Sequence, residues 1–223
     1  MKMVVDARFK CPFNAIVAGA SRTGKTTLIS KLLRLKEQIY DIPPENVIVI
    51  YKYQQPIYQK MKEEKLVNEF IQINDSRFNY DKLVEKVSPF KDGDGSMIIF
   101  DDTLTDLPDN FEQIFTNLSH HMNCSVFYLT QNLFYQNKSF RTLSLNAHYI
   151  FVMRSKRNLN QMKFLAQQTC PGNVKFITDS YTDATHNPFT FLCFDFSPDS
   201  PDILRLRANI FPEDFPYTIY LEN

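Results

Sequence analysis

Eight consecutive residues near the N-terminus have the types and spacing that phosphate binding requires. Gly19–Thr26 (GASRTGKT) fits the pattern G-x-x-x-x-G-K-[ST] at every fixed position. Glycines let the backbone curl so that its N–H groups point at a phosphate, and the positive end of a following helix faces the same anion. We expect Lys25 to reach the β- and γ-phosphates of ATP and Thr26 to offer its hydroxyl to Mg²⁺. The predicted nucleotide-binding residues are Gly19, Ala20, Ser21, Arg22, Thr23, Gly24, Lys25, Thr26 and Thr27.

Two adjacent carboxylates follow a later apolar run, MIIF at Met97–Phe100. At the end of a buried strand, one carboxylate of such a pair holds Mg²⁺, usually through a water. A second acidic side chain beside it can orient or deprotonate the attacking water. We therefore predict Asp101 as the metal-side residue and Asp102 as the catalytic base, the alternative being a surface pair that begins a turn.

Further polar residues could complete the chemistry. Gln131 follows the next expected strand, and ligands of open parallel sheets bind outside the carboxyl ends of the strands. It could therefore sense the γ-phosphate or position water, or it could simply cap the strand. An arginine supplied by a neighbouring subunit stabilises transition-state charge. Arg141, Arg154 and Arg157 are candidates, although a structural surface role is the favoured interpretation for any one of them from chemistry alone.

The elements that must position these residues follow from the hydrophobic pattern. Short apolar runs alternate with longer amphipathic stretches, which is typical of a parallel sheet flanked by helices. We expect strands at 13–18, 47–51, 97–100, 125–129 and 148–153. We expect helices directly after the glycine loop and over 57–70, 80–87, 110–122 and 159–168. Two further strands, at 189–196 and 203–208, should extend the sheet at an edge or pair with each other.

Composition fits a globular α/β protein. The 223 residues are 43% apolar and 22% charged, which predicts a single domain over 1–223, with a core at about 13–170 and a strand extension at about 172–211. The 25 basic and 25 acidic residues balance, so net charge gives no support to nonspecific nucleic-acid binding, although a local patch or a ring can concentrate positive charge. The four cysteines lack zinc spacing and are expected to be buried free thiols. The absence of a signal peptide or membrane span predicts an intracellular protein, or one delivered into a particle without secretion.

The order of motifs resembles the FtsK/HerA-type genome-packaging ATPases, especially those of poxvirus-like viruses and of the Polinton/adintovirus group. The resemblance covers about Phe13 to Phe211. Five segments carry it: GASRTGKT, MIIFDD, HHMNCSVFYLTQNLF, FRTLSLNAHYIFVMR and DATHNPFTFLCFDFSPDSPDILRLRANIF. The loop is specific only for the P-loop superfamily, whereas the combination of Asp-Asp, strand-Thr-Gln-Asn and the Asn-Ala-His-Tyr strand is more specific.

The resemblance implies a RecA/FtsK-HerA-like P-loop NTPase core with extra C-terminal edge strands. Members assemble into rings, commonly hexamers, and use ATP to drive double-stranded DNA into a preformed capsid. Lys25 and Thr26 would form the Walker A pair, Asp101 and Asp102 the Walker B pair, and Gln131 the sensor. Arg141 would be the arginine that acts in trans. Such a protein would bind capsid proteins and no membrane, and would work in the host nucleus or virus factory or accompany the virion.

Two departures from the family pattern are visible. Larger members carry an additional N-terminal domain, whereas this chain begins almost at the strand before the loop. The neutral charge also leaves the DNA-contacting loop unassigned, with Lys91 beside the DGDG turn and the segment 138–141 as candidates.

Two other functions compete with a motor. A P-loop kinase acting on a nucleoside or another small molecule suits the length, but the sequence has no clear arginine-rich lid. A nucleotide-dependent switch without hydrolysis would not need the full set of Lys25, Thr26, Asp101 and Asp102.

Overall fold

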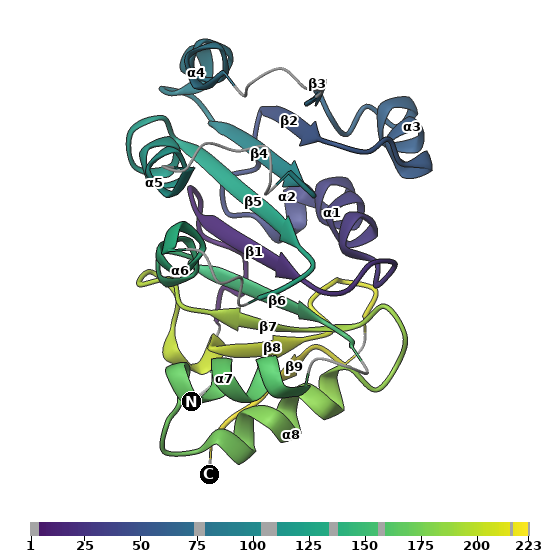
Figure 1. The fold of residues 1–223 in the computed structure, drawn as a ribbon, viewed down its shortest axis with the longest axis vertical. Helices are drawn as coiled ribbons and strands as arrows, with labels where there is room; N and C mark the ends of the chain where they lie inside the picture. The colour runs from purple at the N-terminus through teal and green to yellow at the C-terminus, as the bar shows by residue number, and fades with distance from the viewer. Residues whose placement is uncertain are drawn as a thin grey trace.

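A single sheet organises the molecule. The computed structural model describes residues 5–73, 79–103, 111–133, 138–155, 159–214 and 216–222, and within these ranges nine strands join in the order β3-β2-β4-β5-β1-β6-β7-β8-β9 (Figure 1). The strands are β1 (Asn14–Ala18), β2 (Asn46–Tyr51), β3 (Glu69–Gln72), β4 (Ser96–Asp101), β5 (Cys124–Thr130), β6 (Tyr149–Met153), β7 (Phe191–Asp195), β8 (Leu206–Ala208) and β9 (Thr218–Ile219). The helices are α1 (Lys25–Arg34), α2 (Lys36–Ile39), α3 (Pro56–Glu63), α4 (Tyr80–Val87), α5 (Phe111–His121), α6 (Lys138–Leu145), α7 (Leu159–Thr169) and α8 (Val174–Ala184).

The central strands are parallel, and the C-terminal ones are not. Strands β3, β2, β4, β5, β1 and β6 pair in parallel, and β7, β8 and β9 add to β6 in antiparallel fashion. Every residue of β1, β2, β4, β5 and β6 is buried, which explains their continuous apolar runs. The expected parallel sheet with extra C-terminal strands is confirmed, and the two tail strands both extend the edge and pair with each other.

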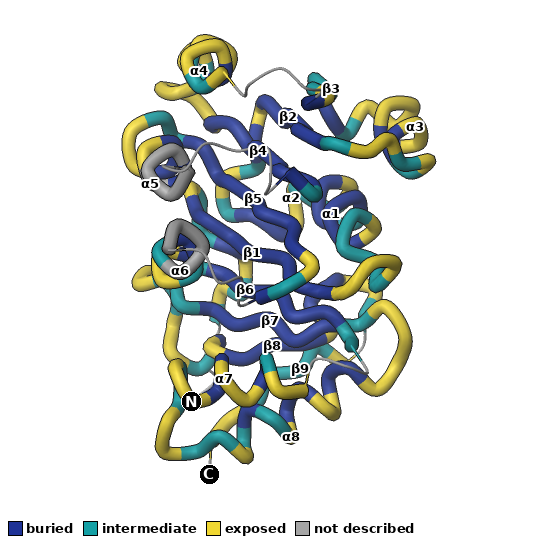
Figure 2. The backbone as a smooth tube through the Cα atoms, viewed as in Figure 1, coloured by how far each residue is buried: buried dark blue, intermediate teal, exposed yellow. Residues whose placement is uncertain are grey.

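Helices cover both faces of the sheet, as Figure 1 shows. Alternate residues of each strand point to opposite faces, so Ala15 and Val17 of β1 pack with α1, α2 and α3, whereas Ile16 and Ala18 pack with the layer of α4 to α8. In Figure 2 the central strands are dark and the outward helix faces are largely exposed. None of the helices among the described residues is long and apolar enough to cross a membrane.

One expected helix is wrong in its second half. The helix predicted over 57–70 ends as α3 at Glu63, and β3 then begins at Glu69. Lys65 adopts a left-handed backbone (φ 54°), which a continuing right-handed helix does not allow. The sequence pattern did not indicate this break, because the break lies in a Glu/Lys-rich run. The short edge strand β3 that follows is only partly buried and so has no continuous apolar run. Helices α6 and α8 were not predicted. The strand that ends at Ala208 begins at Leu206, three residues later than expected, since Asp202–Leu204 forms a 3-10 turn.

Candidate functional site

The glycine loop joins the end of β1 to the start of α1, as the motif predicts. The Gly19 N–H donates to the Thr130 carbonyl oxygen of β5 at 3.0 Å, which fixes the loop to the neighbouring strand. A Cβ on Gly19 would lie 2.6 Å from the Met153 Cβ and 2.7 Å from the Thr23 Oγ1, so no side chain fits there. Gly24 has φ 96° immediately before α1, a conformation that L-residues rarely adopt. Both fixed glycines are therefore required by the local geometry.

The ammonium of Lys25 lies over this loop. Its Nζ donates to the carbonyl oxygens of Gly19 at 2.8 Å and Ala20 at 3.1 Å. Burial lowers the pKa of Lys25, while the negative charges of Asp101 and Asp102 oppose this shift. A partly desolvated cation beside the N-terminus of α1 favours an anionic ligand at this position.

Asp101 is the last residue of β4, and only 3% of its surface is exposed. Its Oδ2 accepts three hydrogen bonds, from Thr26 Oγ1 at 2.9 Å, Tyr58 OH at 2.8 Å and Gln55 Nε2 at 3.2 Å. Burial raises the pKa of Asp101, and the hydrogen bonds from Tyr58 and Thr26 and the charge of Lys25 lower it. These contacts hold the carboxylate rigidly against the first turn of α1.

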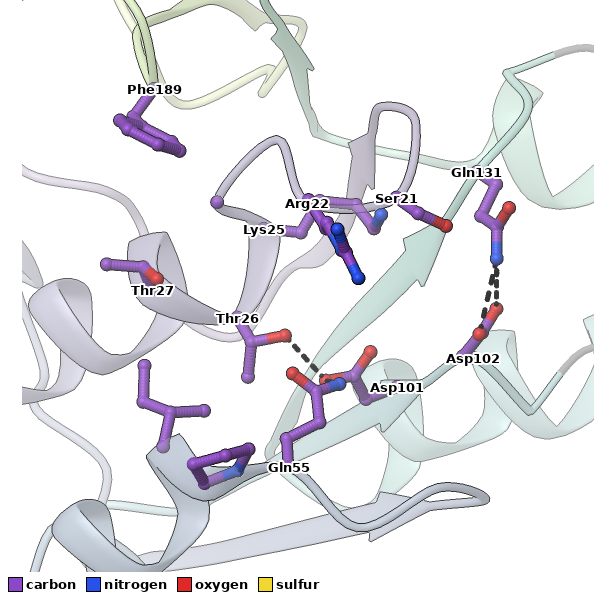
Figure 3. A pocket seen from close by; sticks show the side chains of 13 residues that line it. Ser21, Arg22, Lys25, Thr26, Thr27, Gln55, Asp101, Asp102, Gln131 and Phe189 are labelled. Carbon is purple, nitrogen blue, oxygen red and sulfur yellow. Dashed lines mark hydrogen bonds between the residues drawn. The ribbon is translucent and has the colours of Figure 1, made fainter.

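The side chain of Asp102 faces Gln131. Gln131 Nε2 lies 3.3 Å from each carboxylate oxygen of Asp102 (Figure 3). This pairing follows from the strand order, because β5 lies between β4 and β1 and so brings Gln131 between the acidic pair and the glycine loop. Asp102 has φ 56°, a left-handed conformation in which Asp and Asn are enriched among non-glycine residues. It is half-buried, whereas Asp101 is almost fully covered, so Asp102 is the carboxylate open to solvent.

A cavity of about 500 Å³ unites these side chains. It is lined by Ser21, Arg22, Gly24, Lys25, Thr26, Thr27, Gln55, Pro56, Ile57, Asp101, Asp102, Gln131 and Phe189. In Figure 3 the Arg22 guanidinium points into the cavity, and Phe189 lies on the side opposite Gln131. Two cations and two carboxylates thus face one space of the size typical of ligand sites.

The arginines considered for a neighbour's site have different locations. Arg141 belongs to α6, but its side chain lies outside the described part of the chain. Arg154 is half-buried just beyond β6, and its backbone N–H donates to the Thr190 carbonyl oxygen at 2.9 Å. Arg157 lies in the segment 156–158, outside the described residues. The trans role of Arg141 remains a prediction.

The side-chain oxygens of Thr26 and Asp101, at the end of β4, are suitable ligands for Mg²⁺. Thr26 Oγ1 and Asp101 Oδ2 are hard oxygen ligands 2.9 Å apart, and Mg²⁺ is usually held by one or two protein oxygens together with phosphates and waters. Among the described residues there is no cluster of three or more His, Cys, Asp or Glu side chains suited to a metal. A Mg²⁺ ion here would therefore depend on the nucleotide for much of its coordination.

Cysteine and histidine contribute nothing to this cavity. Cys124 and Cys193 are buried free thiols, as expected, whereas Cys11 and Cys170 are only partly covered. Burial raises the pKa of the Cys11 and Cys193 thiols to about 12, which makes both poor nucleophiles. His120 and His121 are exposed at the end of α5.

Three residues of the site, Gln55, Tyr58 and Phe189, were not predicted from the sequence. One signal for Gln55 was available, because it lies four residues after the end of β2, and the carboxyl end of β2 lies at the same edge of the sheet as Asp101. Tyr58 reads as an ordinary apolar position of α3, and only the packing of that helix brings its hydroxyl to the acidic pair. Phe189 lies far along the chain in a loop, and no motif marks it.

Comparison with solved structures identifies the fold. The genome-packaging NTPase B204 of Sulfolobus turreted icosahedral virus 2, in complex with sulfate, superposes with a TM-score of 0.58 at 13% identity, over 85% of this chain and 94% of that one. The same protein in complex with AMPPCP gives 0.56 at 13% identity, over 82% and 92%. The assembled ATPase EscN of enteropathogenic E. coli is more distant, at 0.46 and 9% identity over 69% and 45%. No family model and no curated protein sequence matches. The chain thus shares with this packaging NTPase the fold of a mostly parallel sheet flanked by helices.

Proposed function

We propose that this chain hydrolyses ATP, with Mg²⁺, in the cavity between Lys25 and Asp102. One observation carries the proposal. The cavity brings the phosphate-binding loop together with a carboxylate bonded to the Thr26 hydroxyl, and with a second carboxylate that is open to water and paired with Gln131. A site that only bound a nucleotide would have no need of the Asp102–Gln131 pair.

Each residue has a distinct part in the proposed reaction. Lys25, Arg22 and the N–H groups of the loop bind the phosphates and offset the charge that develops during transfer. Thr26 and Asp101 would hold Mg²⁺, which would supply positive charge to offset that of the phosphates. Asp102 accepts a proton from the attacking water, and the Gln131 amide orients that water. The hydrogen bonds that Thr26, Tyr58 and Gln55 donate to Asp101 favour its ionised form.

We further propose that hydrolysis drives double-stranded DNA into a capsid. Two observations support this step: the resemblance of the five sequence segments to FtsK/HerA-type packaging ATPases, and the likeness in fold to a protein described as a genome-packaging NTPase over most of both chains. On this proposal the chain forms a ring, with six subunits as the expected number, and binds capsid proteins in the nucleus or virus factory of the host cell.

Ring formation and DNA coupling can be tested together. We expect the particle mass, measured with ATP and with double-stranded DNA, to rise from one subunit to about six. Phosphate release should increase when double-stranded DNA is added. A ring that hydrolyses ATP at the same rate with and without DNA would contradict DNA translocation while leaving the ATPase proposal intact.

The trans role of Arg141 has a sharper test. Lys25→Ala removes the phosphate contact of a subunit's own loop, whereas Arg141→Ala would remove the residue offered to its neighbour. Each variant alone should be inactive. In mixed rings an Arg141→Ala subunit can receive the arginine of a Lys25→Ala neighbour, so activity should return. Mixed rings that form and stay inactive would reject the trans assignment. Arg154→Ala, which truncates another arginine considered for this role, is the comparison variant.

A further inference from the structure

A second cleft lies directly beside the phosphate cavity. It has a volume of about 270 Å³ and shares Gly24, Thr27 and Phe189 with the larger cavity. The remaining wall consists of Leu28, Lys31, Thr190, Phe191, Asn209, Phe211 and Asp214. A ligand whose phosphates occupied the glycine loop could therefore continue into this cleft past Phe189.

The cleft follows one face of α1. Gly24, Thr27, Leu28 and Lys31 stand at positions i, i+3, i+4 and i+7, which share one side of a helix. These seven residue steps span about 10 Å along the helix axis. The cleft thus starts at the phosphate-binding end of α1 and runs away from it. Phe189 and Thr27, which line both spaces, lie on the side of the larger cavity opposite Gln131 and Asp102 (Figure 3).

An aromatic ring stands where the two spaces join. Phe189 is 68% exposed and has φ 64°, an unfavourable combination for a large apolar residue. Its ring lies against the loop, since a Cβ placed on Gly24 would be 3.2 Å from the Phe189 Cδ1. An exposed aromatic face held in a strained conformation at the mouth of a cleft offers a surface on which a flat ring can stack.

The far end of the cleft is polar. Lys31 Nζ lies 3.2 Å from Asp214 Oδ1 and 3.1 Å from Glu213 Oε1, and it stands 3.8 Å above the centre of the Phe211 ring. The Asn209 amide lies on the same wall. The cleft therefore combines apolar and aromatic sides with donors and acceptors at its end, which matches the apolar faces and polar edges of a nucleobase.

We propose that this cleft binds the base of the nucleotide, with the base stacked on Phe189. The inference rests on the proposed function for the phosphate side of the ligand. It adds the element of recognition that distinguishes a nucleotide from a bare polyphosphate. Base–aromatic stacking contributes enough that the loss of the ring should weaken nucleotide binding by about tenfold or more.

The sequence contains no tryptophan, so Phe189→Trp would introduce a single fluorophore at the stacking position. We expect ATP to change its emission and inorganic tripolyphosphate, which fills the same loop without a base, to leave it nearly unchanged. An equal response to both ligands, or no response to ATP at saturation, would overturn the inference.

Affinities measured by calorimetry complete the test. Phe189→Ala should raise the Kd of ATP about tenfold and leave the Kd of tripolyphosphate unchanged. Phe164→Ala, which truncates an exposed phenylalanine on α7, should alter neither constant. If Phe189→Ala weakens both ligands equally, weakens neither, or changes only ring assembly, Phe189 does not bind the base. If neither ligand binds the unaltered protein, the proposed nucleotide function itself fails, and the base cleft with it.

Discussion

The hydroxyl of Tyr58 donates a 2.8 Å hydrogen bond to Oδ2 of Asp101, the carboxylate at the end of β4. Tyr58 reaches it from α3, on the face of the sheet that α1 also covers. Burial and the negative charge of Asp101 raise the pKa of Tyr58, so the phenol stays protonated and remains a donor at every working pH. A helix that no motif marks therefore contributes a hydrogen bond that lowers the pKa of the expected metal-side residue.

The pH profile should report this contact. Burial raises the pKa of Asp101, and protonation of Asp101 abolishes metal binding, so activity should fall as the pH decreases through that pKa. The Tyr58 bond lowers the same pKa, and its loss must raise it further. Tyr58→Phe should therefore shift the acid limb of the kcat/KM profile to higher pH.

Tyr51→Phe is the matched control, because Tyr51 packs against Tyr58 with ring centres 4.8 Å apart and its hydroxyl has no assigned role. We expect the acid limb of the kcat/KM profile of Tyr51→Phe to lie at the same pH as that of the unaltered protein. A Tyr58→Phe limb that coincides with that of the unaltered protein, or lies at lower pH, would show that the bond does not tune Asp101.

Gln131 should act on turnover rather than on affinity. Its amide contacts both oxygens of Asp102, the proposed base, at 3.3 Å. We expect Gln131→Ala to lower kcat by about a hundredfold with little change in the Kd of ATP. Gln59→Ala removes a glutamine whose amide contacts Glu63 on the exposed surface of α3, and should have no effect. A rise in the Kd of Gln131→Ala with kcat preserved would reassign Gln131 to nucleotide binding.

Gly19→Ala should damage the loop specifically. The new Cβ would approach the Met153 Cβ to 2.6 Å, and neither atom can move without shifting a backbone. We expect a loss of about 1–3 kcal/mol in the free energy of unfolding, together with the loss of tight ATP binding. At Gly172 a Cβ would meet nothing within 4 Å, so Gly172→Ala should be neutral in both measurements. Normal ATP affinity in Gly19→Ala would mean that the loop relaxes at little cost.

The antiparallel extension contains a buried ion pair that can be tested for stability. Arg207 Nη2 of β8 and Asp195 Oδ2 of β7 lie 2.7 Å apart with both side chains fully buried, and Arg207 Nη1 donates to the Ala7 carbonyl oxygen at 2.6 Å. Asp195→Asn would leave a buried charge uncompensated and should cost about 3–5 kcal/mol in urea denaturation. The double variant Asp195→Leu with Arg207→Met should recover most of that loss. A midpoint that is unchanged in Asp195→Asn would show that water reaches Arg207.

The hydrophobic periodicity and the glycine motif predicted the parallel sheet, because strand ends and helix starts depend on local residue types. They also predicted that one edge of the sheet would hold the site residues Lys25, Thr26, Asp101, Asp102 and Gln131. The break after Glu63 escaped prediction, since a polar helix and a polar turn read alike until Lys65 adopts its left-handed conformation. Tyr58 and Phe189 escaped for a different reason. Their roles arise from the packing of α3 and of the loop before β7 against the site, and these distances are set by the whole fold.

The most direct test of the account is phosphate release from ATP in the presence of Mg²⁺, compared between the unaltered protein and Asp102→Asn. Asn tolerates the left-handed backbone found at Asp102 (φ 56°), so the substitution removes the base without straining the chain. We predict a fall in kcat of roughly 10²- to 10⁴-fold with ATP affinity retained. Equal turnover in the two proteins, or transfer of the phosphoryl group to a small molecule with no free phosphate released, would contradict hydrolysis at this site.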